Sequence, residues 1–459
     1  MKTKLFIAGL IAVSLLASGL GCKQSGEARN YKPVTLQYWG VFESSEDIEK
    51  LTRSYTQRHP KITIQYRRLR ENEYRQKMLE AWALGQGPDL FIIPNTQIRE
   101  FLKFTEPMPA TMRAPVQYEK GTIKKEIIDE IRTYTGYNPK QVRDSFLDIV
   151  YEDVVINNKI YGLPYSVDTL SVFYNRELLK NNNIALPAKT WQELAAQASL
   201  ISRADSEDRI VQSTVALGAT NNIPTVLDIV STLMMQLNIT MGDAGGPAFH
   251  TNPESIDAIQ FFLSFAQKGL KNYSWNKDMP QALDAFSSGK LAYFIGYPYN
   301  APIIRSTNPK LDFDVIPMFQ PEGTQGASVP TYASYWVTVV TKPKSSETKQ
   351  KAELAWQYLL ESTNANNVKA FINNPGNPRT TALRALVEEQ KNDLILGPFA
   401  HNLLSAQSWY KGYDFGLAKK YFLDMINNIE NANRQNLQPQ TFLAAGVNLI
   451  GQTYQPPPE

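Results

Sequence analysis

The chain has 459 residues, of which 43% are hydrophobic and 20% are charged. This length suffices for two or three domains with a large hydrophobic core. The formal net charge is only +3, and basic and acidic residues are interspersed. This pattern lacks the basic stripe of a nucleic-acid-binding protein, so we expect no nucleic-acid partner. After the N-terminal segment, no stretch approaches the roughly 18 apolar residues that a membrane-spanning helix requires.

The N-terminal residues follow the order of an export signal. Lys2 and Lys4 precede an apolar run over residues 5–16, which is too short for a comfortable membrane span. Small residues follow this run: Ala17, Ser18, Gly19 and Gly21. We therefore predict a signal peptide over residues 1–21, with an uncleaved anchor helix as the alternative.

Cys22 is the sole cysteine, so the chain cannot form an internal disulfide. The segment before it resembles the lipobox of bacterial lipoproteins, although Gly19 stands where that family usually has leucine. In that family the cysteine becomes the first mature residue and is lipidated. The resemblance implies attachment to the extracytoplasmic face of the cell membrane through Cys22. Residues 22–32 are polar and poor in core-forming side chains, which predicts a flexible tether.

The body begins with alternating strands and helices. Alternating apolar residues predict strands over residues 33–39 and 59–66, and "GPDLFIIP" at residues 87–94 is typical of a buried strand. Helical patterns follow Ser44 and cover residues 74–84. A strand–helix order of this kind indicates right-handed crossovers and a mainly parallel sheet, so the predicted fold class is α/β.

The middle of the chain is richer in helix. Thr190 with Glu193 forms the capping-box pattern at the start of a helix, and residues 252–270 and 345–360 have helical spacing. Further predicted features are a surface element over residues 105–150 at the rim of a cleft, a helix within it over residues 122–136, and a disordered tail over residues 454–459.

The sequence contains no recognisable catalytic centre. His59, His250 and His401 lack partners at metal-ligand spacing, and hydrolase, metalloprotease and phosphate-loop motifs are missing. Adjacent acidic pairs such as Glu152–Asp153 and Glu388–Glu389 are poor candidates for a glycosidase dyad, because sequence neighbours rarely face each other across a substrate. We therefore expect a protein that is not an enzyme and uses neither a metal nor another cofactor.

Aromatic residues are abundant instead, including 23 tyrosines. Flat rings with a polar tip suit sugar faces, although each ring taken singly is as consistent with core packing. Several stand where strands are expected to end: Trp39, Tyr165, Tyr297, Tyr299, Tyr335 and Trp336. Their grouping favours a binding surface.

Five segments together resemble the family 1 extracellular solute-binding proteins of ABC importers, the maltose- and oligosaccharide-binding class. The segments are "LQYWG" at 36–40, "ALGQGPDLFII" at 83–93, "YGLPYSVDTLSVFYNRELL" at 161–179, "LPAKTWQEL" at 186–194 and "AFSSGKLAYFIGYPY" at 285–299. Each is weak alone, and their order and spacing carry the resemblance.

The resemblance implies a two-lobed periplasmic-binding-protein-like α/β fold (type II) with a ligand cleft between lobes joined by a multi-strand hinge. The expected first lobe comprises residues 33–166 and 332–376, and the second comprises residues 167–331 and 377–453. Chain crossings are expected near residues 165–170, 332–337 and 374–381.

The resemblance also implies a site and a function. Asp168 matches an acidic residue that binds sugar hydroxyls, and Tyr299 matches a stacking tryptophan. The other expected contacts are Trp39, Tyr165, Asn95, Tyr297, Trp336 and Trp409. The implied function is capture of a mono- or oligosaccharide and its delivery to the permease subunits of an ABC transporter by a monomer. Alternatives are an adhesion or sensing lipoprotein, a non-sugar polar ligand, and a secreted polysaccharide-cleaving enzyme.

Overall fold

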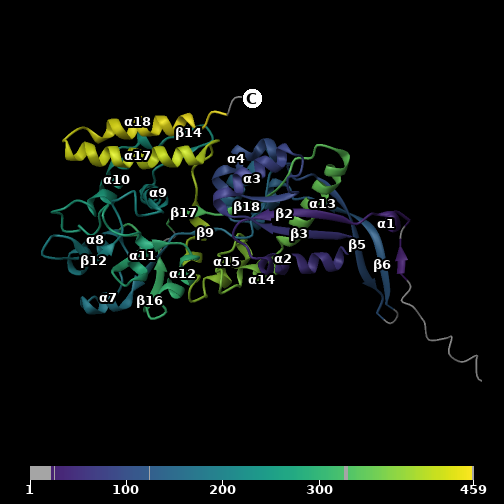
Figure 1. The fold of residues 1–459 in the computed structure, drawn as a ribbon, viewed down its shortest axis with the longest axis horizontal. Coiled ribbons are helices and arrows are strands. Elements are labelled where there is room, and N and C mark those ends of the chain that lie inside the picture. Colours follow the sequence, from purple (N-terminus) through teal and green to yellow (C-terminus); the bar gives the residue numbers. More distant parts are fainter. Residues whose placement is uncertain (1–21, 25, 123–124, 325–328, 457–459) are drawn as a thin grey trace, which may run out of the picture. The chain divides into compact units, whose positions relative to one another are not determined.

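The computed structural model describes residues 22–24, 26–122, 125–324 and 329–456. Contacts divide the chain into two units (Figure 1). The first comprises the described residues of Met1–Leu90, Pro109–Gly136 and Pro343–Ser362, and the second comprises those of Phe91–Met108, Tyr137–Lys342 and Thr363–Glu459. These boundaries differ from those expected for the two lobes, which stay a prediction. The signal peptide lies outside the described residues, as do residues 457–459 of the tail.

The first unit begins its body with the expected strand–helix–strand order. Its elements are β1 (Cys22–Gln24), α1 (Gly26–Asn30), β2 (Val34–Gly40), α2 (Ser45–Arg58), β3 (Ile62–Arg68), α3 (Glu71–Ala83), β5 (Thr111–Lys120), β6 (Glu126–Thr135) and α13 (Ser346–Ser362). Strands β2 and β3 pair in parallel, with Val34 opposite Ile62. A capping box between Ser44 and Asp47 starts α2, which buries Leu51 in the core of this unit. The strand and helix predictions for this part are confirmed.

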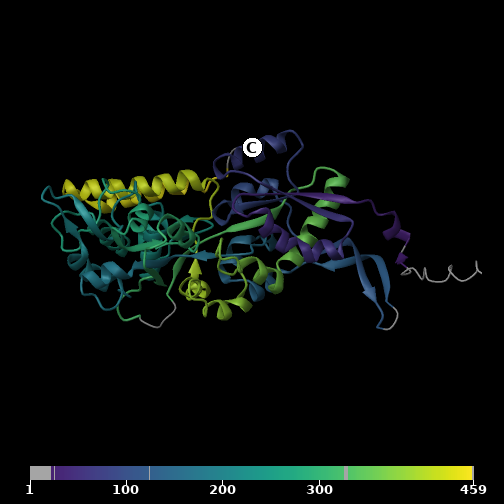
Figure 2. The ribbon, with the colours of Figure 1, turned by 60° about the horizontal axis from the view of Figure 1, so that its bottom comes forward.

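A long hairpin occupies most of the region expected as a surface feature. Strands β5 and β6 pair antiparallel from Thr111 opposite Thr135 to Lys120 opposite Glu126 (Figure 2). The helix predicted over residues 122–136 is therefore wrong. Its isoleucines and threonines are β-branched and favour a strand once a partner strand is present. Residues 137–150 belong to the second unit, and the proposed place of this region at a cleft rim stays a prediction.

The described residues of the expected tether have regular secondary structure. Strand β1 pairs in parallel with β6, with Cys22 opposite Ile127. Helix α1 buries Ala28, and its Glu27 accepts hydrogen bonds of 2.7 and 2.9 Å from Arg113. The hairpin edge supplies the hydrogen-bonding partner that the sequence pattern of this short segment did not reveal.

The second unit contains a five-stranded mixed sheet in the order β11-β12-β15-β10-β16. Strand β10 is antiparallel to β15 and β16, whereas β12 is parallel to β15. The elements up to this sheet's last strand are β4 (Leu90–Pro94), η1 (Asn95–Gln97), α4 (Ile98–Phe101), η2 (Leu102–Phe104), α5 (Pro139–Ser145), α6 (Asp148–Val154), β7 (Val155–Ile156), β8 (Lys159–Ile160), β9 (Asp168–Thr169), β10 (Ser171–Asn175), α7 (Arg176–Asn181), α8 (Trp191–Ile201), β11 (Arg203–Ala204), β12 (Ile210–Val215), α9 (Val226–Gln236), β13 (Gly242–Asp243), β14 (Gly246–Pro247), η3 (Phe249–Thr251), α10 (Glu254–Ser264), α11 (Ala282–Ser287), β15 (Leu291–Gly296), α12 (Asn300–Thr307) and β16 (Phe313–Pro317).

A small sheet in the order β19-β17-β9 carries the chemistry discussed below. In it Ser334 lies opposite Asp168, and Tyr332 lies opposite Gln407. The remaining elements of the second unit are β17 (Thr331–Ser334), β18 (Trp336–Val340), α14 (Ala365–Ile372), α15 (Arg384–Gln390), α16 (Gly397–Ala400), η4 (Leu403–Ser405), β19 (Ala406–Gln407), α17 (Phe415–Arg434) and α18 (Pro439–Gln452). Helices α17 and α18 pack side by side (Figures 1 and 2).

Several local predictions in the second unit are confirmed and two are adjusted. The capping box of Thr190 and Glu193 is present at the start of α8. Helix α10 ends at Ser264, which is earlier than the predicted stop at Gly269. Tyr454, the first residue of the predicted tail, is buried against Tyr410 with ring centroids 5.1 Å apart, so it packs with this unit. Within the described ranges, no helix is long and apolar enough to cross a membrane.

Candidate functional site

Asp168 presents a partly exposed carboxylate that is anchored on one side only. The backbone N–H and the hydroxyl of Thr380 donate to its Oδ1 at 3.2 and 3.1 Å. Its Oδ2 accepts no hydrogen bond from the part of the chain that the structure describes. Burial raises the pKa of Asp168 to about 6, while the Thr380 bonds and the charge of Arg379 oppose the rise. The side chain is thus fixed in place and keeps one acceptor for a ligand.

The same region contains Tyr165. Its ring lies 5.4 Å from that of Phe371, and the guanidinium carbon of Arg379 lies 4.3 Å from the Phe371 ring centroid. Arg379 precedes Thr380, so Tyr165 and Asp168 both approach one short segment. The predicted crossing segments also meet here, because Asp168 lies opposite Ser334 and binds Thr380. Tyr165 itself is buried.

The carboxylate of Asp228 accepts a hydrogen bond from one member of the stacked pair Tyr297 and Tyr299. Tyr297 and Tyr299 stack with ring centroids 5.8 Å apart and an interplanar angle of 17°. Tyr297 is buried and donates its hydroxyl to Oδ2 of Asp228 at 2.9 Å, whereas Tyr299 is 47% exposed. Burial raises the pKa of Asp228 to about 6. The arrangement offers an exposed ring on a rigid support, which suits the flat face of a sugar.

Asp228 was missed in the sequence. It is the one charged residue of helix α9 and stands between Leu227 and Ile229. A single acid within an apolar helical run is a usable signal, because a buried carboxylate requires a partner. The identity of that partner, Tyr297, comes from a distant strand end and is visible only in the folded chain.

Tyr332 on β17 carries a buried hydroxyl without a hydrogen-bonding partner among the described residues. Its pKa is raised well above the usual value, first by burial and then by the charges of Asp228 and Asp153. An unpaired buried hydroxyl is costly and requires an explanation such as a water molecule or a bound ligand. The charges of two carboxylates therefore act on one buried, unpaired hydroxyl in this part of the second unit.

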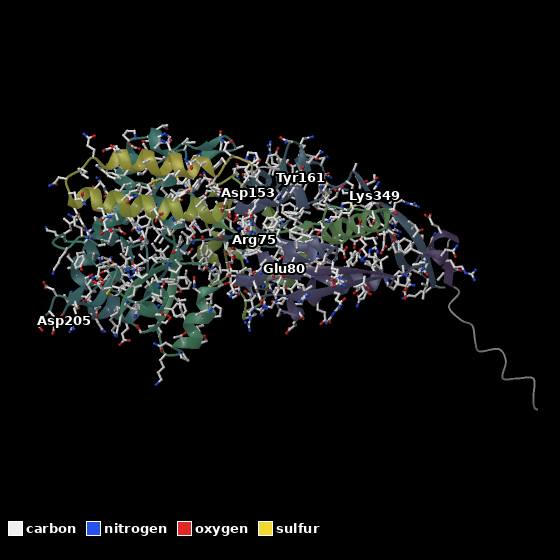
Figure 3. The ribbon with its side chains drawn as sticks, turned by 45° about the horizontal axis from the view of Figure 1, so that its top comes forward. Arg75, Glu80, Asp153, Tyr161, Asp205 and Lys349 are labelled. Carbon is white, nitrogen blue, oxygen red and sulfur yellow. The ribbon has the colours of Figure 1, made fainter. Side chains whose placement is uncertain are left out.

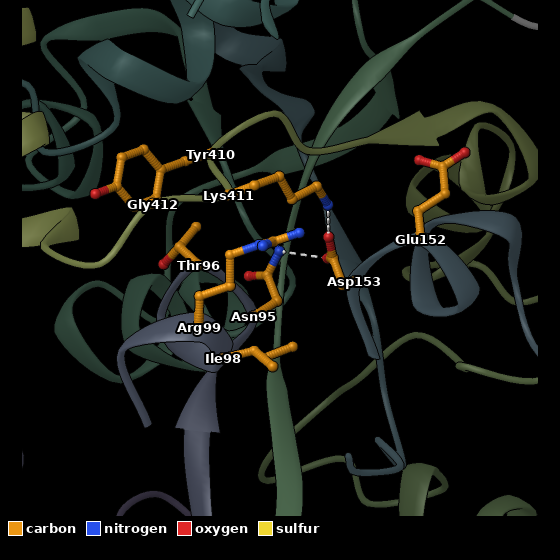
Figure 4. Close-up of a pocket in the computed structure, with 9 residues that line it drawn as sticks. All are labelled: Asn95, Thr96, Ile98, Arg99, Glu152, Asp153, Tyr410, Lys411 and Gly412. Atoms are coloured by element: carbon orange, nitrogen blue, oxygen red, sulfur yellow. Dashed lines mark hydrogen bonds and ion pairs between the residues drawn. The ribbon is translucent and has the colours of Figure 1, made fainter. Parts of the chain in front are cut away.

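Asp153 on α6 is buried, and its carboxylate binds several other side chains instead of facing open space (Figures 3 and 4). Its carboxylate forms an ion pair with Lys411 and accepts from Tyr335 at 2.7 Å, from Asn95 at 2.9 Å and from Ser408 at 3.1 Å. In Figure 4 it is turned toward Lys411 and Asn95 and away from Glu152. The amide of Asn95 therefore holds chain segments together.

Asp153 and its partners Lys411 and Asn95 line a small pocket of the second unit. The lining residues are Asn95, Thr96, Ile98, Arg99, Glu152, Asp153, Tyr410, Lys411 and Gly412 (Figure 4). Within the pocket, Asn95 and Lys411 both bind the carboxylate of Asp153. The described residues contain no group of three or more histidines, cysteines or acids able to hold a metal ion.

The three predicted tryptophans have different surroundings. Trp39 is buried in the first unit, with the guanidinium of Arg67 5.0 Å from its ring. Trp336 is partly exposed on β18. Trp409 is only 2% exposed and donates its Nε1–H to the Ser231 hydroxyl at 2.9 Å. Trp409 therefore has a packing role, and the ligand contacts of all three stay predictions.

Comparison with known proteins places the chain in a family. Residues 43–373 match the model of the bacterial extracellular solute-binding proteins, and this match covers well over half of the chain. The chain therefore belongs to the family of bacterial extracellular solute-binding proteins. This family assignment confirms the resemblance inferred from the sequence motifs and favours a binding role over an enzymatic one.

Relatives and solved structures agree with this assignment. The maltodextrin-binding protein MdxE of Bacillus subtilis (strain 168) is 26% identical over 257 residues, or 54% of this chain and 57% of that protein. The match thus spans little more than half of that relative's length. A putative binding protein of Brucella abortus (strain 2308) is 21% identical over 361 residues, covering 77% of this chain and 76% of that protein.

The fold is that of solved sugar-binding members. A cyclo/maltodextrin-binding protein complexed with maltotetraose matches with a TM-score of 0.68 and 16% identity, covering 93% of this chain and 98% of that chain. At this identity the likeness establishes the fold, and the predicted two-lobed α/β periplasmic-binding-protein-like fold of type II is confirmed.

Proposed function

We propose that this protein captures a carbohydrate outside the cytoplasm and delivers it to an ABC transporter for import. The observation that carries the proposal is the geometry of Asp168, whose Oδ1 is held by Thr380 while Oδ2 has no partner among the described residues. An ionised carboxylate with a free oxygen accepts hydrogen bonds from hydroxyl groups with charge assistance. The exposed ring of Tyr299 supplies the second element that sugar recognition needs, a flat apolar face.

The relatives indicate which class of ligand to test first. The named relative binds maltodextrin, and a solved structure of the same fold holds maltotetraose. Linear glucose oligosaccharides are therefore the first ligands to test, with Asp168 and Tyr299 as proposed contacts. Tyr297 and Asp228 are proposed to support the Tyr299 ring from behind.

A ligand panel tests this function. Thermal unfolding is measured with maltose, maltotriose and maltotetraose, with other mono- and oligosaccharides, and with amino acids and short peptides as non-sugar solutes. A ligand at about 100 times its dissociation constant adds about 2.7 kcal/mol of stability. Stabilisation by non-sugar solutes alone would support the alternative ligand class, and stabilisation by no member would favour an adhesion or sensing role.

Attachment through Cys22 is proposed together with this function. The structure describes the backbone of Cys22 as the first residue of β1. Expression of the full chain in a bacterium followed by membrane fractionation tests the anchor. The wild-type protein should sediment with membranes and be extracted by detergent, whereas Cys22→Ser should be released, because lipid chains and not a protein helix hold the protein there. Equal sedimentation of both proteins would contradict lipidation.

A further inference from the structure

Gln390 is the last residue of helix α15. The oxygen and the nitrogen of its side-chain amide both form hydrogen bonds to a neighbouring loop. Its Oε1 accepts from the backbone N–H of Thr381 at 2.8 Å, and its Nε2 donates to the carbonyl of Arg379 at 2.8 Å. The side chain is 7% exposed. The amide is therefore fully oriented by two buried backbone groups that flank one residue, Thr380.

Thr380 is the residue that holds Asp168. Its backbone N–H donates to Oδ1 of Asp168 at 3.2 Å, and its hydroxyl lies 3.1 Å from the same oxygen and also donates to the carbonyl of Val167. The surrounding segment has little regular secondary structure, with an isolated bridge between Ser166 and Thr381 and a backbone bond from Val167 to the Thr380 carbonyl. Few ladder bonds fix this loop, so the two hydrogen bonds of Gln390 contribute to the direction of the Thr380 donors together with the bonds between Thr380 and Val167.

The other side of Gln390 borders open space. It lines a cavity of about 240 Å³ together with Lys369, Ile372, Asn373, Leu386, Glu389, Asn392, Asp393 and Leu396. The two hydrogen bonds of its amide fix the orientation of the Gln390 side chain. Leu386 lies one turn earlier on α15 and lines the same cavity, and no side-chain bond joins it to the loop.

We propose that Gln390 is a positioning residue of the ligand site, which fixes the loop of residues 379–381 so that Thr380 presents two donors to Asp168. This inference rests on the proposed ligand role of Asp168. Gln390 does not touch the ligand itself. It acts through the loop, and its removal lets the Thr380 donors turn away from the carboxylate.

The titration of Asp168 reports on this arrangement without any ligand. Burial raises the pKa of Asp168, and the two Thr380 bonds and the charge of Arg379 lower it. The partner strand contributes the uncharged Ser334, and helix α16, which packs against β9, has no ionisable side chain. Loss of the Thr380 bonds should therefore raise the pKa of Asp168 further.

Three variants separate positioning from stability. Gln390→Met keeps the length of the side chain and removes both hydrogen bonds. Gln390→Glu keeps an acceptor for Thr381 and replaces the donor to the Arg379 carbonyl with a carboxylate oxygen, so it breaks that bond while the bond to Thr381 remains possible. Leu386→Ala is the matched control, because it enlarges the same cavity and leaves the loop bonds in place.

The measurements are the pH titration of the Asp168 carboxyl carbon by NMR in the ligand-free protein and the affinity for a stabilising sugar by calorimetry. We expect Gln390→Met to raise the pKa of Asp168 and to weaken binding roughly tenfold near neutral pH. Leu386→Ala should lower the melting temperature and change neither quantity. An unchanged Asp168 titration in both Gln390 variants, or an equal change in Leu386→Ala, would overturn the inference. A shifted titration in a protein that binds no sugar would instead refute the proposed function alone.

Discussion

Replacing Asp168 with asparagine should stabilise the protein and weaken ligand binding at the same time. Asparagine has nearly the same shape and keeps an oxygen that accepts from Thr380 N and Oγ1. It removes the charge that burial disfavours. Asp168 is partly exposed, so water can satisfy the new amide donors.

The size of the expected stability change follows from the pKa of Asp168. The pKa of Asp168 rises from 3.8 to about 6 on folding. Each unit corresponds to about 1.36 kcal/mol, so the ionised side chain costs up to about 3 kcal/mol. Because the folded state retains a proton that the unfolded state has lost, the wild-type protein loses this stability as the pH rises from about 4 to about 6. The stability advantage of Asp168→Asn should be small below about pH 4 and complete above about pH 6.

Urea unfolding between about pH 4 and pH 8 measures this effect. The pH dependence that remains in the variant belongs in part to Asp228, whose pKa is also raised to about 6. Calorimetry with a stabilising sugar should show a loss of roughly 10- to 100-fold in affinity, because a hydrogen bond to a charged group contributes about 1.5–3 kcal/mol. A variant that is less stable than the wild type at pH 8, or a stability difference that does not grow with pH, would refute the reasoning.

Two further substitutions distinguish ligand contact from structural support. Tyr299→Ala should weaken sugar binding by about 1–2 kcal/mol with little change in melting temperature, because the ring is 47% exposed. Calorimetry measures the affinity, with Tyr299→Phe as the control. Unchanged affinity in Tyr299→Ala would remove Tyr299 from the site. Asp153→Asn should lower the free energy of unfolding by about 3–5 kcal/mol, because it leaves Lys411 without its buried counter-charge. A loss below about 1 kcal/mol in urea unfolding would show that the ion pair between Asp153 and Lys411 contributes little to stability.

The sequence by itself determined the fold class, because periodic patterns and caps act locally. The alternation in residues 33–39 and the capping box of Thr190 and Glu193 each specify an element without help from distant residues. The motif order then sufficed for the family. Asp168 and Tyr299 were predicted as contacts because they match positions of the family's motifs, and their contact with a ligand stays a prediction.

Local patterns failed where a distant partner decides the structure. The segment 122–136 has a charged, amphipathic composition that suits a helix, yet most of it forms β6 because β5 offers ten paired positions. Residues 22–24 likewise become a strand because the edge of β6 is available.

The tertiary structure alone decided which polar groups hold the site. Asp228 and Thr380 act through partners far away in sequence, Tyr297 and Asp168. Gln390 binds the backbone of the nearby loop around Thr380, and that loop approaches residues 166–168 only in the folded chain. Conversely, Trp409 and Asn95 resemble ligand contacts in the sequence, and the fold buries both among structural partners. A side chain's burial and its hydrogen-bonding partner depend on how the whole chain packs. The sequence therefore specified the class of this protein, and only the packed chain showed which polar side chains are buried and which partners they have.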